Sequence, residues 1–443
     1  MIKLSCDFSN TIGPVKPMHG VNNGPMVSYH NFDNFHYLTD AGVPYSRLHD
    51  TGGYFGSTHF VDVENIFSDM NADENDPKSY DFTFTDLYVT KLVEAGVEPF
   101  YRLGATIENG HHIKAYHIYP PKDYEKFARI CANIVRHYNY GWADGFNYNI
   151  KYWEIWNEPD NSDVIEENPC WKGTKEQFFE LYRVVANHLR NEFPEIKVGG
   201  YASCGFYACM SGEASAEEIK NANVSPRYKY FVTFFNEFMD YISNPETSAP
   251  MDFFTWHTYS AGPRAVVQAE YVRKQLDSRG LNHVESILNE WNPQFNRHGN
   301  NDHMVDIAQI MVLLHRYVDQ LDFYTADYAA YGSLFDFYTR KPTKAYYAFP
   351  AFNELYKLGR AVEVETDSVN CSALGATDGR QNAIMFVNAG GEEQEVSLAG
   401  TPFKNAKGIK IVNDNNSTAE TTECFFGERI VLSGKSVVVI KTV

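Results

Sequence analysis

The sequence predicts an α/β protein: a (β/α)8 TIM barrel followed by an antiparallel β-sandwich. Strand-like and helix-like segments alternate up to residue 358, eight such pairs can be counted, and short β runs replace them from about residue 360. This alternation implies parallel strands joined by helical crossovers. We therefore expect a catalytic barrel over residues 15–358 and a sandwich over 359–443, with residues 1–14 pairing with the sandwich.

A repeated unit marks the first half of the barrel. The first strand is expected near residues 19–21. Helix-like stretches then end at Gly42 and Gly96, and each is followed by Val, a strand-like aromatic segment and Arg-Leu, at 45–49 and 98–103. Glycine suits these positions because the residue after a helix often adopts a left-handed conformation.

The second half of the barrel continues the rhythm. Apolar residues recur at helical spacing over 124–138, and Thr174 with Gln177 has the spacing of a capping box at the start of the next helix. An open doubly wound sheet is the alternative, but the phosphate-binding glycine loop that usually accompanies it does not follow the first strand. The remaining strands are expected at 152–156, 197–201, 253–259, 285–289 and 322–327, and the remaining helices at 228–242, 265–276, 304–318 and 344–358.

The C-terminal region reads as a small antiparallel β-sandwich because its β runs are separated by Gly, Asn and Asp. No aromatic platform is evident in it, so we expect it to brace the barrel rather than bind sugar. The runs lie at 361–365, 382–388, 395–398, 408–412, 429–432 and 436–441.

The amino-acid composition limits the classes of partner that the protein is expected to bind. The net charge of −19 disfavours nucleic acid and anionic membranes and favours a neutral ligand, and the 15% of aromatic residues suits sugar stacking. Seven scattered cysteines indicate free thiols in a reducing compartment. No signal peptide or membrane span is evident, so we expect a cytoplasmic protein, and a homo-oligomer is compatible with the sequence.

Two strand ends carry the candidate catalytic groups. Residues 152–160 read Tyr-Trp-Glu-Ile-Trp-Asn-Glu-Pro-Asp, and residues 287–292 read Ile-Leu-Asn-Glu-Trp-Asn. Glu158 and Glu290 thus end strands 4 and 7, and barrel active sites lie at the C-terminal ends of strands. Paired carboxylates are what cleavage of a glycosidic bond requires, with retention of configuration if they lie about 5–5.5 Å apart.

Neighbouring strand ends supply candidate substrate-binding residues. Asn157 could bind a sugar hydroxyl near the reacting carbon, where the hydrogen bond strengthens in the transition state. Arg47 and His49 leave strand 2, and Arg47 could keep a catalytic glutamate ionised. Glu154 lies on the strand face of Glu158 and is interpreted as a structural partner of an arginine such as Arg47 or Arg102.

Strand 6 and two tryptophans complete this set. His257 or Tyr259 could orient the nucleophile, Trp291 could stack on sugar or lie in the barrel wall, and Trp171 is a candidate for an outer subsite.

Glu108 with His111 and His112 looks like a metal cluster, but the helical spacing of metal ligands is missing. We interpret these three residues as a solvated or substrate-contacting rim. No metal or organic cofactor is expected.

The segments at 153–159 and 289–292 resemble the retaining (β/α)8 glycoside hydrolases of clan A, and within it family 39, which contains β-xylosidases and α-L-iduronidases. The resemblance implies that Glu158 is the acid/base and Glu290 the nucleophile, and that Asn157, His257 and Tyr259 line the −1 subsite. The segments around residues 19–25 and 48–53 do not match xylosidases, so the substrate is less well defined than the reaction.

We expect a retaining, exo-acting O-glycosidase on short oligosaccharides. A β-xylosidase ranks first, an arabinosidase, arabinobiosidase or other exo-glycosidase second, and an endo-glycanase third. An iduronidase ranks low because the only cations in the pocket segments are Arg47 and Arg102. The charge of Glu290 is expected to raise the pKa of Glu158.

Two readings come from other classes. One is a carbohydrate-binding protein on an inactive hydrolase barrel, which would not need two close carboxylates. The other is a lyase or aldolase, which would need a lysine at a strand end, whereas Lys151 and Lys197 lie at strand beginnings.

Overall fold

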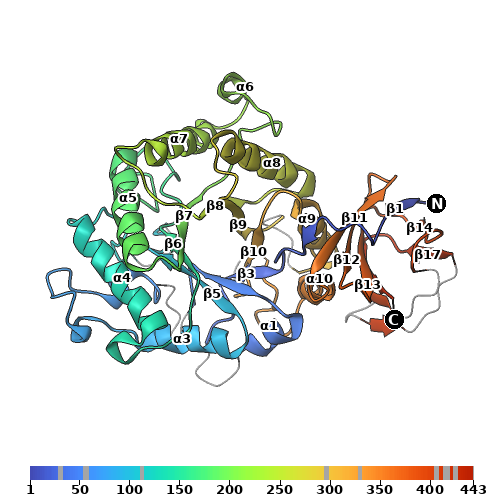
Figure 1. Cartoon of the computed structure of the whole chain (residues 1–443), viewed down its shortest axis with the longest axis horizontal. Helices are drawn as coiled ribbons and strands as arrows, with labels where there is room; N and C mark the ends of the chain where they lie inside the picture. The colour runs from blue at the N-terminus through green and yellow to red at the C-terminus, as the bar shows by residue number, and fades with distance from the viewer. Residues whose placement is uncertain are drawn as a thin grey trace.

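A computed structural model of the chain describes residues 1–27, 33–52, 59–109, 114–293, 299–327, 332–403, 409–412, 420–422 and 428–442. Eight parallel strands close into a barrel in the order β10-β3-β4-β5-β6-β7-β8-β9 (Figure 1). The predicted TIM barrel is therefore confirmed. The strands are β3 (Gly20–Asn22), β4 (Tyr45–Leu48), β5 (Glu98–Leu103), β6 (Tyr152–Ile155), β7 (Lys197–Ser203), β8 (Phe253–Thr258), β9 (Glu285–Trp291) and β10 (Gln320–Tyr324).

Helices follow each strand and surround the barrel (Figure 1). Gly42, with φ of 62°, ends the first helix in the left-handed conformation that the sequence predicted, and Gly96 has φ of 77°. The capping box at Thr174 and Gln177 is present. The helices are α1 (Phe35–Ala41), α2 (Val63–Ile66), α3 (Thr83–Glu94), α4 (Tyr124–Tyr140), α5 (Lys175–Glu192), α6 (Ala216–Asn221), α7 (Pro226–Ser243), α8 (Gly262–Ser278), α9 (Asn301–Leu314) and α10 (Ala348–Tyr356), with the 3-10 segments η1 (Pro77–Ser79), η2 (Trp142–Asp144) and η3 (Lys344–Tyr347).

The barrel interior changes character along its axis. An apolar cluster of Phe100, Tyr152, Phe253 and Ile287 fills the barrel near the beginnings of the strands. Further along several of the strands, toward the C-terminal rim, charged and amide side chains take over, and they are buried: Asn22, Arg47, Arg102, Glu154 and Asn289. Because buried polar groups must be paired, this upper layer fixes the geometry of whatever site lies above it.

The C-terminal region forms two antiparallel sheets. A larger sheet has the order β1-β11-β12-β13-β18-β15-β16, with β2 also paired to β11, and a smaller one pairs β14 with β17. Both contribute side chains to one apolar cluster, so they face each other as an unequal sandwich. The predicted pairing of the chain start is confirmed, because Leu4–Cys6 pairs with β11. The strands are β1 (Leu4–Cys6), β2 (Gly13–Pro14), β11 (Arg360–Thr366), β12 (Cys371–Thr377), β13 (Asn382–Asn388), β14 (Gln394–Ser397), β15 (Ile409–Val412), β16 (Glu420–Thr422), β17 (Arg429–Leu432) and β18 (Ser436–Lys441).

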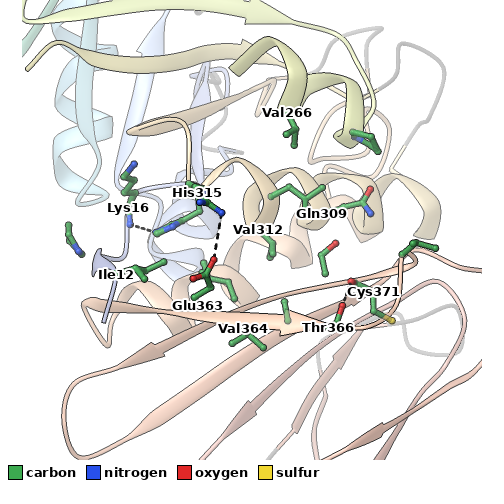
Figure 2. Close-up of a pocket in the computed structure, with 18 residues that line it drawn as sticks. Ile12, Lys16, Val266, Gln309, Val312, His315, Glu363, Val364, Thr366 and Cys371 are labelled. Atoms are coloured by element: carbon green, nitrogen blue, oxygen red, sulfur yellow. Dashed lines mark hydrogen bonds and ion pairs between the residues drawn. The ribbon is translucent and has the colours of Figure 1, made fainter. Parts of the chain in front are cut away.

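A cavity of about 770 Å³ lies where the larger sheet meets the barrel helices. Figure 2 shows Val266 and Gln309 from the barrel helices facing Thr366 and Cys371 from the sheet. Its only acidic lining residue among those described is Glu363, which pairs with Arg316 at 3.7 Å. The cavity therefore lacks the two carboxylates that the predicted chemistry needs, although it is larger than the cavity at the barrel rim.

Within the described part of the chain, no helix has both the length and the apolar character needed to span a membrane.

Candidate active site

The C-terminal rim of the barrel holds a cavity of about 390 Å³ into which both predicted glutamates open. The wall comes from the ends of several strands and from the start of α7. The lining residues are His49, Asp50, Ile107, Asn109, Glu158, Cys204, Tyr207, Arg227, Tyr228, Phe231, Tyr259, Glu290 and Tyr324.

The chain around Glu158 is held in an unusual backbone conformation. Trp156 and Glu158 have φ of 74° and 47°, in the left-handed region that few non-glycine residues adopt. The Trp156 N–H donates to Leu103 O at 2.9 Å and the Glu158 N–H to Ala202 O at 3.0 Å, so neighbouring strands on both sides hold the segment. Pro159 then fixes the next φ. Strained conformations of this kind cluster at functional sites.

Glu290 is surrounded by donors. Arg47 Nη1 lies 3.1 Å and Asn22 Nδ2 3.4 Å from its Oε2, and the Tyr259 hydroxyl donates to its Oε1 at 2.7 Å. Burial and the charge of Glu290 raise the pKa of Tyr259 well above its ordinary value, so the phenol stays protonated and can donate. These partners hold both oxygens of the Glu290 side chain in a fixed orientation, as attack by a nucleophile requires.

Glu158 has a different environment. His257 Nδ1 lies 2.9 Å from its Oε1, and Asn161 Nδ2 donates to its Oε2 at 2.7 Å. Burial alone would raise the pKa of Glu158, but the hydrogen bond and positive charge of His257 lower it. The sequence-based expectation of a raised pKa is therefore wrong for the free site, because it considered Glu290 and not the histidine.

His257 brings the two glutamates together. Its Nδ1 also lies 3.8 Å from Glu290 Oε2, and one ligand atom from each of these three residues lies within 4.8 Å of the other two. Imidazole and carboxylate groups at this spacing could hold a divalent ion. However, the Arg47 guanidinium already supplies a positive charge next to Glu290, so we interpret the cluster as a nucleophile, Glu290, beside a hydrogen-bonded Glu158–His257 pair.

Arg47 and Asn157 lie beneath the cavity. Arg47 is fully buried, and its Nε and Nη2 donate to Glu154 Oε2 and Asn157 Oδ1, each at 2.7 Å. The interpretation of Glu154 as a structural partner of Arg47 therefore agrees with the geometry. Arg102, the other arginine considered, pairs with Asp62 at 2.7 Å instead.

His49 and Tyr259 line the cavity, as their strand positions suggested. Burial, and then the charges of Arg47, Arg102 and His257, hold the pKa of His49 well below its usual range. His49 is therefore a neutral imidazole that can donate or accept one hydrogen bond at each nitrogen.

The structure places Trp171 and Trp291 in the protein interior, so Trp171 does not form an outer subsite and, of the two alternatives for Trp291, the barrel wall holds. Trp171 is 1% exposed, and its indole N–H donates to Thr174 O while its ring packs edge-on against Trp156. Trp291 is fully buried and packs against Phe323 in the barrel wall. Neither ring can stack on a sugar, because neither is accessible from the cavity.

The predicted rim around Glu108 is only partly visible. His111 and His112 lie outside the described residues. Glu108 is buried, and its Oε1 accepts a hydrogen bond from the His117 backbone N–H at 2.9 Å, so its carboxylate is engaged by its own loop. The six described cysteines are free thiols, and Cys424 lies outside the described residues.

Several lining residues were missed by the sequence analysis. Asp50 directly follows the predicted His49, Tyr324 lies within the predicted eighth strand and ends the observed β10, and Arg227 is the second residue of α7. Arg227 binds Asn161 through its Nε, at 2.5 Å from the backbone oxygen, and through its Nη2, at 2.6 Å from Oδ1. Position at a strand end was a usable signal for Asp50 and Tyr324, whereas nothing local distinguishes Arg227.

Comparisons with known proteins identify the family to which the chain belongs. The sequence profile of the glycosyl hydrolases of family 39 matches residues 57–336. A β-xylosidase of Geobacillus stearothermophilus is 25% identical over 223 residues, which are 48% of this chain and 37% of that protein. A β-xylosidase of Caldicellulosiruptor saccharolyticus is 31% identical over 136 residues, 28% of this chain and 26% of that protein. The matched region thus spans about a third or less of each relative.

Solved structures share the architecture over the whole chain. A glucosidase from Croceicoccus marinus has a TM-score of 0.73 at 20% identity, covering 100% of this chain and 98% of its own. A monomeric β-xylosidase from Caulobacter crescentus has a TM-score of 0.66 at 16% identity, covering 99% of both chains. At these identities the similarity establishes the fold.

Proposed function

The chain belongs to family 39 of the glycosyl hydrolases, and from this premise we propose that it is a retaining, exo-acting O-glycosidase that acts as a β-xylosidase. The observation that carries the proposal is the pair Glu158 and Glu290, which open into one cavity. A carboxylate oxygen of each glutamate lies within 4.8 Å of one of the other, with His257 beside both. Retaining enzymes place their carboxyl groups about 5–5.5 Å apart, whereas inverting enzymes leave room for a water molecule between them.

The proposed first step is attack by Glu290 on the anomeric carbon. The glycosidic C–O bond breaks as the new bond to the carboxylate oxygen forms. A proton passes to the leaving oxygen from the Glu158–His257 pair, whose atoms are 2.9 Å apart, so the proton can lie on either residue before the substrate binds. Arg47 and Tyr259 hold Glu290 in position during the attack.

The second step returns the enzyme to its starting state. Glu158, now a carboxylate, takes a proton from water while the water oxygen attacks the anomeric carbon and releases Glu290. The lowered pKa of Glu158 suits its role as the base in this step. The lowered pKa makes Glu158 a weaker source of the proton in the first step, and the neighbouring His257 provides a second place for that proton within hydrogen-bonding distance.

Three features support a small neutral substrate. The cavity of about 390 Å³ is at the small end of the range for ligand sites. Its described lining residues include three carboxyl groups, Asp50, Glu158 and Glu290, and one cation, Arg227, so an anionic sugar would be repelled. The two sequence relatives are named β-xylosidases.

A screen of aryl glycosides with NMR detection of the first-formed anomer tests the proposal. We expect the β-xyloside to be cleaved with retention of configuration. Glu290→Gln should lower kcat by at least about a thousandfold, because the nucleophile is lost. Azide should rescue Glu158→Ala on a substrate with a good leaving group. The control is Glu285→Gln, at the opposite end of the same strand, which should leave turnover unchanged.

Three outcomes would contradict the proposal: inversion of configuration, full activity of Glu290→Gln, or sugar binding without turnover of any glycoside. The third result would instead support a carbohydrate-binding protein on a hydrolase barrel.

A further inference from the structure

Asp50 is the third carboxyl group of the active-site cavity, and the proposed mechanism does not use it. It follows β4 and lines the cavity together with Glu158 and Glu290. Its φ of 54° lies in the left-handed region, so its side chain is displayed by an uncommon backbone conformation. The side chain is only 11% exposed.

This carboxyl group is poorly supplied with hydrogen bonds. Oδ2 accepts one from the Tyr324 hydroxyl at 3.2 Å. Oδ1 is buried and accepts none from the described residues, and the nearest ring nitrogen, His49 Nε2, is 3.5 Å away. An ionised carboxylate can accept about four hydrogen bonds. Burial and the charge of Glu290 accordingly raise the pKa of Asp50 to about 7.

A bound sugar could provide the donors that Asp50 lacks. The hydroxyl groups of a neutral sugar are its only hydrogen-bond donors, so any donor that the substrate brings to Asp50 is a hydroxyl. A hydroxyl that donates to Asp50 would compensate for part of the cost of burying the carboxylate.

The contacts of Asp50 place it on the side of the nucleophile. Asp50 accepts a hydrogen bond from Tyr324 of β10, the strand that pairs with the β9 strand of Glu290, and the charge of Glu290 acts on its carboxyl group. The Glu158 carboxyl group has separate partners, His257 and Asn161, and Arg227 holds Asn161. The leaving group departs toward the acid/base residue, so Asp50 faces the far end of the sugar that is being cleaved off.

We propose that Asp50 is a specificity-determining residue that accepts a hydrogen bond from the 3- or 4-hydroxyl of the sugar at the non-reducing end. This inference rests on the proposed function and deepens it. A carboxyl group that binds a free hydroxyl of the terminal sugar occupies the place where a further sugar would be linked, so the same contact would make the enzyme exo-acting.

Monodeoxy substrates test the contact. The aryl glycoside found in the screen is compared with its 2-, 3- and 4-deoxy forms in the wild-type enzyme and in Asp50→Ala and Asp50→Asn. Loss of a hydrogen bond to a charged group should lower the wild-type kcat/KM for one of the 3- and 4-deoxy substrates by about 10- to 100-fold. In Asp50→Ala the same deoxygenation should change kcat/KM by less than about threefold, because the partner is already missing.

Asp160→Asn is the matched control. Asp160 is also buried, and burial raises its pKa to about 7, but it accepts hydrogen bonds from Ser203 and Cys204 and does not line the cavity. Its effect should be the same on all four substrates. If 3- and 4-deoxygenation cost Asp50→Ala as much as they cost the wild type, Asp50 has only a structural role and the inference is wrong.

A binding measurement separates this inference from the proposed function. The four sugars are titrated into Glu290→Gln with and without Asp50→Ala, and the same pattern of coupling is expected in Kd. If Asp50→Ala and deoxygenation are coupled in Kd but the wild type turns over no glycoside, the proposed hydrolysis is refuted and the contact with Asp50 stands. If the wild type turns over the glycoside but the two changes are not coupled, the proposed function stands and the contact with Asp50 is refuted.

Discussion

Tyr259 shows how a single side chain prepares the nucleophile. Its hydroxyl donates to Glu290 Oε1 at 2.7 Å, while Arg47 and Asn22 contact the other oxygen, Oε2. The two oxygens are therefore held by different partners, and the carboxylate cannot rotate without losing one set. Because Tyr259 stays protonated, this arrangement does not change over the pH range in which the enzyme would work.

Tyr259→Phe should lower kcat by about 10- to 100-fold, since a hydrogen bond to a charged group contributes about 1.5–3 kcal/mol. KM should change little, because the hydroxyl contacts Glu290 rather than the substrate. Steady-state kinetics on the aryl glycoside measures both constants. Tyr182→Phe is the control, because it also removes one hydroxyl group, but the Tyr182 hydroxyl is buried and donates to Pro250 O outside the cavity. A kcat within threefold of the wild type would show that Arg47 and Asn22 orient the nucleophile without the phenol.

At the scale of single residues, the sequence pointed to cavity residues where a polar side chain ends an apolar strand. Glu158 and Glu290 stood out because a buried strand has no structural use for a carboxylate at its tip. For Trp291 the sequence analysis left two places open, and the alternation of strand residues decides between them, because Trp291 follows Glu290 and therefore points to the opposite face. Arg227 could not have been found, because only the packing of α7 against the loop after β6 brings it to the cavity.

Among the secondary-structure elements, the barrel strands are cross-linked beneath the site by a buried ionic network. Arg47 of β4 binds Glu154 of β6, and Asn289 of β9 donates to the other oxygen of Glu154 at 2.6 Å. All three side chains are fully buried. The network fixes the distance between the strands that carry the two catalytic glutamates, so it positions the site without touching the substrate.

Removing one member of this network should be costly. Glu154→Gln leaves the Arg47 charge without its closest partner, and loss of one side of a buried pair destabilises by about 3–5 kcal/mol. Urea unfolding followed by tryptophan fluorescence measures the change. Glu285→Gln breaks the Lys197–Glu285 pair near the beginnings of the strands, which is about a third exposed, and should cost less than about 1 kcal/mol. An equal loss in the free energy of unfolding for the two variants would show that the buried network contributes no more to stability than a partly exposed ion pair.

The elements themselves were predictable because periodicity is local. The eight strands, the glycine caps and the Thr174 capping box all follow from neighbouring residues. The end of α9 did not: the apolar period continues to residue 318, but the helix stops at Leu314. There His315 Nε2 accepts a hydrogen bond from the Lys16 backbone N–H at 3.0 Å, and this partner lies about 300 residues earlier in the sequence.

For the whole molecule, the barrel and the larger sheet share one hydrophobic core. Side chains of α9 and α10 belong to the same apolar cluster as Leu374, Met385 and Val439 of the sheet. A second cluster, which includes Phe386, lies on the other side of that sheet, toward β14 and β17. The sheet is therefore a layer between the barrel and the small sheet, and in Figure 1 it lies directly beside α9 and α10.

A shared core predicts one cooperative unfolding transition for the chain. Met385 and Phe386 are adjacent and buried, but they face the barrel and the small sheet respectively. Met385→Ala and Phe386→Ala should each cost about 2–5 kcal/mol, and in both variants loss of hydrolase activity should coincide with loss of the circular dichroism of the sheets. If the sheets were an independent unit, Phe386→Ala would give an early transition that leaves activity intact. In that case Met385→Ala would still lower the temperature at which activity is lost, because it removes a contact with the barrel helices. A difference between the two variants in this temperature would show that the barrel and the sheets do not unfold as one cooperative unit.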